Sequence, residues 1–212
     1  MSWQRRLLVG CLRGLLRALS RWEIRGRGNL PSGGPLIVVF NHVAHLDGPL
    51  VIASLPWEVE GISLSDLYAV PVVGQLLRMY GVIAVHRDEF DRQVVRKALQ
   101  VLSEGKVLAL APEARESPSG AMERGREGAA YLAMHSGAPV LPIGLTGTET
   151  ALCMLKRLRR PHLTVNIGAP LQLPGPLAHG AARQAQLQAG HDEIMRRIAA
   201  LLPARYRGVY AQ

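Results

Sequence analysis

The chain has 212 residues, a formal net charge of +9 and 48% hydrophobic residues. This length suits one domain with a large core, and no repeat or long linker divides it. Two cysteines, Cys11 and Cys153, are too few for a disulfide framework and favour a reducing, cytoplasmic setting. Aromatic content is only 5%, and no groove-reading motif accompanies the basic residues, so nucleic acid is not an expected partner.

The positive charge is concentrated in two segments. Residues 1–27 contain seven arginines and one glutamate, and a second basic cluster lies at residues 156–160. Wound as a helix, residues 3–22 place four arginines on one face: Arg6, Arg13, Arg17 and Arg21. The opposite face is apolar: Leu8, Leu12, Leu15, Leu19 and Trp22. This pattern predicts a basic amphipathic helix that lies in a membrane interface, because Arg13 interrupts the apolar run long before the ~20 residues of a membrane span.

From the predicted membrane helix we expect a chain of two parts, located at a membrane surface. We expect residues 1–25 to be a membrane-docking helix that binds a surface rich in anionic lipids, and residues 26–212 to be the main domain. The protein would then be peripheral or monotopic at the cytoplasmic face of the cell membrane. The alternative is that the leucine face only packs on the domain and the helix has no membrane role.

Four short apolar runs indicate buried strands. They span residues 36–40, 81–87, 107–111 and 138–145. Helix-like segments follow at residues 93–102, 128–135 and 184–202. This alternation is typical of βαβ units, so we expect an α/β fold with a mainly parallel sheet flanked by helices.

The end of the first run carries the pattern N-H-x4-D, formed by Asn41, His42 and Asp47. On one helix, His42 and Asp47 would point about 140° apart, so they meet only if the chain turns between a strand and a new helix. Asp47 could then accept a hydrogen bond from one ring nitrogen of His42 and raise the basicity of the other. The spacing predicts a His–Asp dyad without a nucleophile of its own, so the nucleophile would belong to the substrate.

The other three runs also carry motif-like blocks. Gly81 and Arg87 form G-x5-R, Pro112-Glu113-Ala114-Arg115 closes the third run, and residues 140–143 read V-x-P-I. In order and spacing, the four blocks resemble those of the PlsC-like glycerolipid acyltransferases, the 1-acylglycerol-3-phosphate acyltransferase family. The resemblance runs from about Gly26 to Leu145, and more loosely to the end of the chain.

Two positions depart from the family pattern. Ala44 stands where the family usually has serine, and Ala114 stands where it usually has the glycine after the motif glutamate. An alanine at the second position removes freedom at φ > 0 and adds a methyl group where the backbone could approach a ligand phosphate closely. Neither change removes a group that a His–Asp dyad requires.

The resemblance implies an O-acyltransferase of phospholipid biosynthesis. It would move an acyl group from acyl-CoA or acyl-carrier protein to the free hydroxyl of a lysophospholipid, giving phosphatidic acid from 1-acylglycerol 3-phosphate. Another lysolipid or glycerol 3-phosphate is the alternative acceptor. The thioester is a co-substrate, and no bound cofactor is expected.

The resemblance also implies roles for individual residues. His42 would be the general base and Asp47 would orient it. Arg87 and Arg115 would bind the acceptor phosphate, and Glu113 would help to shape the acceptor site. Backbone N–H groups near Gly48 or Ala114 are candidates for stabilising the oxyanion. The alternatives are that Arg87 pairs with a neighbouring acid at the surface and that Glu113 caps a helix.

Other classes of protein fit the sequence less well. A serine hydrolase of the lipase type would need the nucleophile elbow G-x-S-x-G, which is absent. His42, His45 and Asp47 offer metal ligands, but no further His or Cys group stands close by in sequence, so no metal is expected. A non-catalytic basic module that binds lipid or nucleic acid stays open as an alternative, although it leaves the dyad unexplained.

Overall fold

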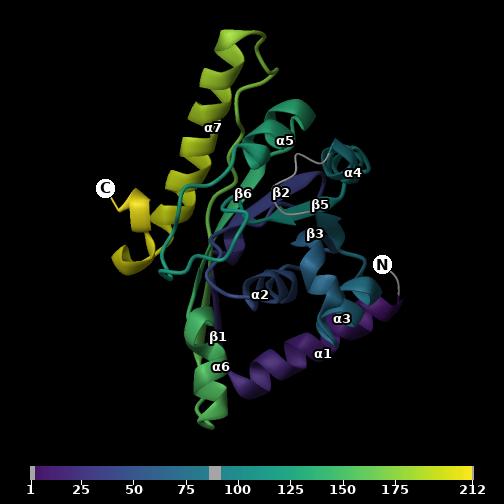
Figure 1. Cartoon of the computed structure of the whole chain (residues 1–212), viewed down its shortest axis with the longest axis vertical. Coiled ribbons are helices and arrows are strands. Elements are labelled where there is room, and N and C mark those ends of the chain that lie inside the picture. The colour runs from purple at the N-terminus through teal and green to yellow at the C-terminus, as the bar shows by residue number, and fades with distance from the viewer. Residues whose placement is uncertain (1–2, 86–91, 212) are drawn as a thin grey trace.

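A seven-stranded sheet forms the centre of the computed structural model, which describes residues 3–85 and 92–211 (Figure 1). The strands are β1 (Arg21–Arg25), β2 (Leu36–Phe40), β3 (Val59–Leu64), β4 (Ile83–Val85), β5 (Val107–Leu110), β6 (Val140–Thr146) and β7 (His162–Ile167). Their order is β1-β7-β6-β2-β5-β3-β4, and every adjacent pair is parallel except β6 and β7. The predicted α/β class with a mainly parallel sheet is confirmed.

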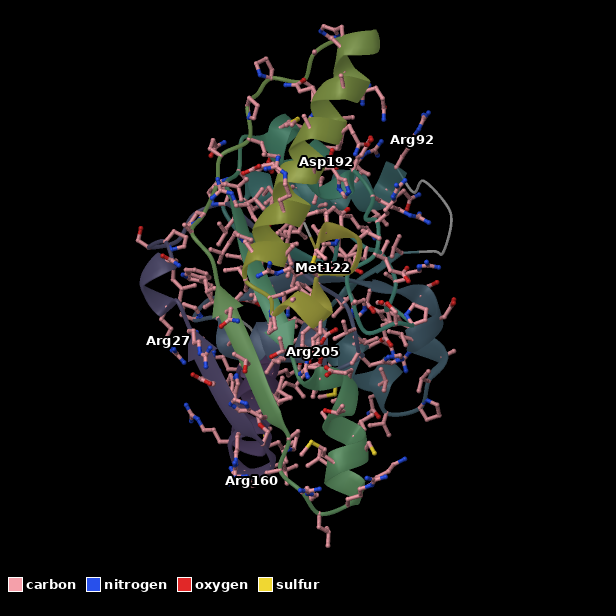
Figure 2. All side chains as sticks on the ribbon, turned by 90° about the vertical axis from the view of Figure 1, so that its left-hand side faces the viewer. Arg27, Arg92, Met122, Arg160, Asp192 and Arg205 are labelled. Atoms are coloured by element: carbon pink, nitrogen blue, oxygen red, sulfur yellow. The ribbon has the colours of Figure 1, made fainter. Side chains whose placement is uncertain are left out.

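Helices cover both faces of this sheet. They are α1 (Trp3–Leu19), α2 (Asp47–Ser54), α3 (Val73–Tyr80), α4 (Arg92–Ser103), α5 (Gly128–Ser136), α6 (Thr148–Lys156) and α7 (Ala181–Ala200). Helices α4, α5 and α7 pack on one face, and α1 and α2 pack on the other. Figure 2 looks onto α7, marked by Asp192, which crosses in front of the strands. Strands β2, β5 and β6, which precede three of the motif blocks, therefore lie between two helical layers.

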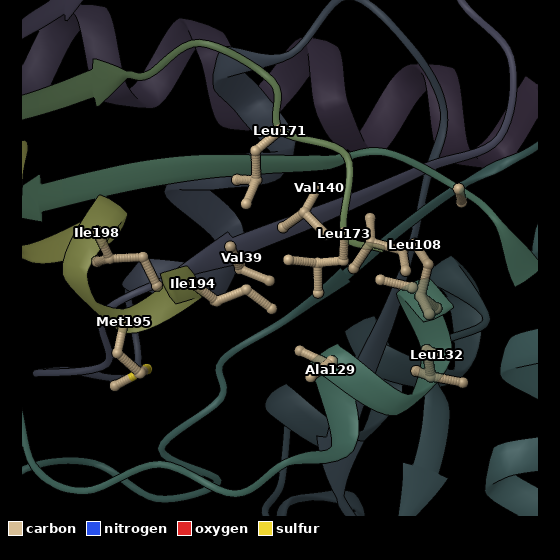
Figure 3. Packing of buried hydrophobic residues seen from close by; sticks show 14 of the residues in the cluster. Val39, Leu108, Ala129, Leu132, Val140, Leu171, Leu173, Ile194, Met195 and Ile198 are labelled. Carbon is tan, nitrogen blue, oxygen red and sulfur yellow. The ribbon is translucent and has the colours of Figure 1, made fainter. Parts of the chain in front are cut away.

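The central strand β2 is buried along its whole length. Ile37 and Val39 belong to the apolar cluster under α5 and α7, whereas Leu36, Val38 and Phe40 belong to the cluster under α1 and α2. Figure 3 shows Val39 among side chains of both helices. A strand that is covered on both faces needs apolar residues at every position, which explains why β2 reads as a continuous apolar run.

Three of the seven strands were not predicted from the sequence. The sequence predicts β2, β4, β5 and β6, but not β1, β3 or β7. In β1, Trp22 and Ile24 alternate with charged residues and pack against the core. This period of two is the signal of a half-buried strand. A run of only five alternating residues is short, however, and its first residues were interpreted as the end of the preceding helix.

Helix α1 differs from the prediction in both length and orientation. It ends at Leu19, and residues 21–25 form strand β1 beside β7, so the predicted boundary after residue 25 falls beyond the first strand of the sheet. The predicted outer face of arginines is correct for Arg6, Arg17 and Arg21, which are exposed, but wrong for Arg13. The side chain of Arg13 points inward and donates to the carbonyl oxygens of Ala53 at 2.9 Å and Leu55 at 2.7 Å. These carbonyls lie at the end of α2, where the helix itself supplies no donors, and the guanidinium satisfies them.

Candidate active site

The N-H-x4-D segment turns at the end of β2 and brings His42 and Asp47 together. Strand β2 ends at Phe40 and α2 begins at Asp47, so the chain reverses between the two side chains. His42 Nδ1 lies 3.0 Å from Asp47 Oδ2. The Asp47 side chain is fully buried, whereas 25% of the His42 side chain is exposed. Because Asp47 occupies Nδ1, Nε2 is the nitrogen left for a substrate proton.

Further donors surround the Asp47 carboxylate. Oδ2 also accepts from the backbone N–H groups of Val43 at 2.7 Å and Ala44 at 2.8 Å. Oδ1 accepts from the hydroxyl of Thr148 at 2.5 Å. Four donors therefore satisfy the two oxygens of this buried side chain. Sequence reasoning missed Thr148, which lies 101 positions along the chain from Asp47 and carries no local motif signal.

The backbone of His42 is held by the segment that follows β5. Its N–H donates to Glu113 Oε1 at 3.0 Å, and its carbonyl accepts from the N–H of Ser117 at 2.8 Å. On the other side, the Asn41 amide makes two bonds to the backbone of Leu145, at 3.0 and 2.7 Å. This arrangement follows from strand order, because β2 lies between β5 and β6. Three motif blocks thus meet at one edge of the sheet, as expected for an α/β site.

Acidic side chains around the dyad raise the pKa of His42, which favours base catalysis. Burial lowers the pKa of His42, but the hydrogen bond and charge of Asp47, together with the charges of Glu116 and Glu113, outweigh burial and raise this pKa above its ordinary value. Burial also raises the pKa of Glu113 to about 7, against the opposing bonds from the N–H groups of Glu123 and His42. A raised His42 pKa means a stronger base, with the protonated form stabilised by Asp47.

Glu113 shapes the site from within the protein. It is only 4% exposed, and its second oxygen accepts from the N–H of Glu123 at 2.8 Å. The next residue, Ala114, has φ +56°, the left-handed conformation that explains why glycine suits this position. The N–H of Ala114 donates to the carbonyl of Ala111 at 3.1 Å, which leaves Gly48 as the remaining predicted oxyanion donor.

The structure describes only one of the two predicted phosphate-binding arginines. Arg115 has a side chain that is 64% exposed and forms an ion pair with Glu123. Arg87 lies outside the described residues. His45, near the dyad in sequence, is 68% exposed and pairs with Glu116 rather than with Asp47. Within residues 3–85 and 92–211, no group of three or more His, Cys, Asp and Glu side chains is placed to hold a metal ion.

Comparison with solved structures supports the fold. PlsC, the 1-acyl-sn-glycerophosphate acyltransferase of Thermotoga maritima, superposes with a TM-score of 0.64 over 90% of this chain and 79% of that one. The two sequences are 21% identical. The mainly parallel sheet and its flanking helices are therefore shared.

Two curated proteins that are similar to this chain are both named as 1-acyl-sn-glycerol-3-phosphate acyltransferases. The chain is 32% identical over 129 residues to the chloroplastic 1-acyl-sn-glycerol-3-phosphate acyltransferase BAT2 of Brassica napus, covering 59% of this chain and 37% of the relative. It is 26% identical over 128 residues to the 1-acyl-sn-glycerol-3-phosphate acyltransferase of Borreliella burgdorferi, covering 59% and 51%. The chain thus spans between about a third and a half of the length of these relatives.

The family assignment rests on a sequence profile. The sequence profile described as Acyltransferase matches residues 21–146, which include all four motif blocks and run from β1 to the end of β6. The predicted resemblance is confirmed, and the chain belongs to the acyltransferase family.

Proposed function

We propose that this protein transfers an acyl group from acyl-CoA or acyl-carrier protein to the free hydroxyl of 1-acylglycerol 3-phosphate, giving phosphatidic acid for phospholipid biosynthesis. The observation that carries the proposal is the dyad, in which a buried carboxylate holds His42 Nδ1 at 3.0 Å and leaves Nε2 for a substrate. The relatives that match over the motif region are named as enzymes acting on this acceptor.

The proposed reaction needs no covalent enzyme intermediate. His42 Nε2 takes the hydroxyl proton while the acceptor oxygen attacks the thioester carbonyl. The tetrahedral intermediate then collapses, the carbon–sulfur bond breaks, and the departing thiolate takes the proton back from His42. Asp47 stays ionised and stabilises the imidazolium between the two steps. The free thiol is one product and the acylated lipid is the other.

A thiol-release assay with a panel of acceptors tests this function. We expect thiol release from acyl-CoA or acyl-carrier protein to depend on lysophosphatidate, and to be slower with phosphate-free lysolipids and with glycerol 3-phosphate. Lipid binding without turnover on any acceptor would instead favour the non-catalytic module. Thiol release without formation of an acylated lipid would indicate a thioesterase.

Arg115 is proposed to bind the acceptor phosphate, and this role gives a second test. A phosphate dianion would compete with Glu123 for the exposed guanidinium, and a charge-assisted hydrogen bond contributes about 1.5–3 kcal/mol. We therefore expect Arg115→Ala to raise the KM for lysophosphatidate about tenfold, with a smaller change for a phosphate-free lysolipid. Steady-state kinetics on both acceptors measures the difference.

A matched control exists on α7. Arg197 is also exposed and ion-paired, with Glu193 at 2.7 Å, but both residues belong to α7 and to none of the motif blocks. Arg197→Ala should leave both KM values unchanged. An equal loss on the two acceptors in Arg115→Ala would remove this arginine from the phosphate site.

We also propose that the protein docks on the membrane through exposed apolar side chains of two neighbouring helices. In α1, Trp3, Leu7 and Leu15 are 72%, 58% and 57% exposed. Helix α3 packs beside α1, and this region also exposes Val72 and Leu76 (Figure 1). Large exposed apolar side chains gathered on adjacent elements mark an interaction surface. Arg13 does not contribute charge to this surface, because its side chain turns inward.

Basic residues border this apolar surface and suit anionic lipid headgroups. Arg6 and Arg17 are exposed on α1. The 156–160 cluster is tied to the end of α1, because Arg160 donates to the carbonyls of Arg17 at 2.8 Å and Ser20 at 2.7 Å. Figure 2 shows Arg160 at the lower end of the molecule. Among the described residues, no helix is long and apolar enough to cross a bilayer. An interfacial position at the cytoplasmic face of the cell membrane fits these features.

Changing the exposed leucines of α1 tests this docking surface. Burying one leucine is worth about 1.5–3 kcal/mol, so Leu7→Gln with Leu15→Gln should weaken binding to anionic vesicles at least about tenfold. Vesicle co-sedimentation measures the effect, and wild-type binding should fall as salt rises. Val209→Gln changes a side chain that is 59% exposed near the C-terminus, and should have no effect. Undiminished vesicle binding of the double variant would mean that α1 is only a packing element.

A further inference from the structure

The carboxylate of Asp47 has one side-chain donor besides His42 among the described residues, the hydroxyl of Thr148. Its Oγ1 lies 2.5 Å from Asp47 Oδ1, and Thr148 is only 2% exposed. The three other donors, His42 Nδ1 and two backbone N–H groups, all reach Oδ2. Thr148 therefore satisfies the one carboxylate oxygen that the N-H-x4-D turn leaves without a donor.

We infer that Thr148 is a positioning residue of the acyl transfer, which holds Asp47 by its Oδ1 so that Oδ2 stays directed at His42. The inference rests on the proposed function and extends the dyad to a Thr–Asp–His series. Its members follow the carboxyl ends of β2 and β6, which lie on the same side of the sheet because these strands are parallel.

The local structure around Thr148 supports a role directed at Asp47. Thr148 is the first residue of α6, and Gly147 precedes it as the N-cap without any side-chain capping bond. The Thr148 hydroxyl thus donates to Asp47 instead of capping its own helix. The same stretch of chain is fixed to the motif at a second point, because the Asn41 amide bonds to the backbone of Leu145. The end of β6 therefore holds the motif both before and after His42.

The electrostatics give this hydroxyl a measurable effect on His42. A hydrogen bond from a hydroxyl to a carboxylate draws negative charge towards Oδ1, and bonds of this kind are short and strong. Without that donor, the buried carboxylate would interact more strongly with a positive imidazolium at Oδ2, so the pKa of His42 would rise. A general base works in its neutral form, and a higher pKa moves the acid limb of the pH–rate profile to higher pH.

Substitution of Thr148 by valine tests the inference, because valine keeps the shape and removes the hydroxyl. We expect kcat to fall about tenfold, the acceptor KM to change by less than about twofold, and the acid limb of kcat/KM to move up by about half to one pH unit. Thr148→Ser, which restores the donor, should recover both values. Thr150→Val is the matched control, since its exposed hydroxyl bonds to the Gly147 carbonyl and the Met154 sulfur rather than to Asp47.

A direct titration separates this inference from the proposed function. Nuclear magnetic resonance of the ring nitrogens of His42 should show the same upward pKa shift in Thr148→Val without any substrate. Should valine beside the carboxylate prevent folding, Thr148→Ala also removes the hydroxyl and should show the shift. An unchanged His42 titration, or a loss of activity that serine does not restore, would reduce Thr148 to a packing residue. A shifted titration in a protein without acyltransferase activity would overturn the function and keep the Thr148–Asp47–His42 coupling.

Discussion

Replacing His42 by alanine is expected to lower kcat for acyl transfer by at least about a hundredfold, because a positioned general base contributes about 10²–10⁴-fold. The protein should stay folded. The surrounding bonds to Asp47 from Val43, Ala44 and Thr148 do not involve the imidazole, and the backbone of residue 42 keeps its contacts with Glu113 and Ser117. Thiol release with lysophosphatidate gives the rate, and circular dichroism of the same sample confirms the fold.

His45 is the matched control for this substitution. It is the same residue type three positions along the chain, but it is 68% exposed and pairs with Glu116. His45→Ala should therefore keep activity within a few-fold of wild type. In the wild-type enzyme, kcat/KM should fall as the pH drops through the pKa of His42, which lies above the ordinary value of 6.5. Near-normal acyl transfer by His42→Ala would exclude the proposed base.

Substitution of Asp47 by asparagine is expected to lower kcat by about a hundredfold or more, chiefly through loss of charge. The N–H groups of Val43 and Ala44 both point at the Oδ2 position, so the amide side chain of the variant must place its oxygen there and its NH₂ group towards Thr148. His42 can still donate from Nδ1 to that oxygen. The correct tautomer is then retained, but the imidazolium formed during the reaction loses its counter-ion.

The pH dependence distinguishes this loss of charge from a loss of geometry. Asp47 raises the pKa of His42 through its hydrogen bond and its charge, so Asp47→Asn should lower that pKa and move the acid limb of kcat/KM to lower pH. This is the opposite direction from the shift expected for Thr148→Val. Thermal unfolding of both variants serves as the control for stability. An acid limb that moves upward in Asp47→Asn would contradict the assignment of Asp47 as the counter-ion.

Local patterns in the sequence were enough to predict the central strand β2 and the His–Asp dyad that follows it. The five residues of β2 are all buried, so their apolar run marked the strand with its observed bounds, and the polar residues that follow marked the dyad. The left-handed conformation of Ala114 is consistent with the glycine that is usual at that position. These features are readable because each depends on residues within a few positions of one another, where period and turn chemistry are visible.

Tertiary structure alone decided which distant groups complete the site. Thr148 reaches Asp47 across 101 positions, and Glu113 reaches the backbone of His42 across 71, because β5 and β6 are the two neighbours of β2 in the sheet. Strand order does not follow from the apolar runs themselves. The orientation of α1 was decided in the same way, since Arg13 turned inward to carbonyl groups at the end of α2. A helical wheel shows where side chains lie around one axis, but not which side meets a partner that can satisfy a guanidinium.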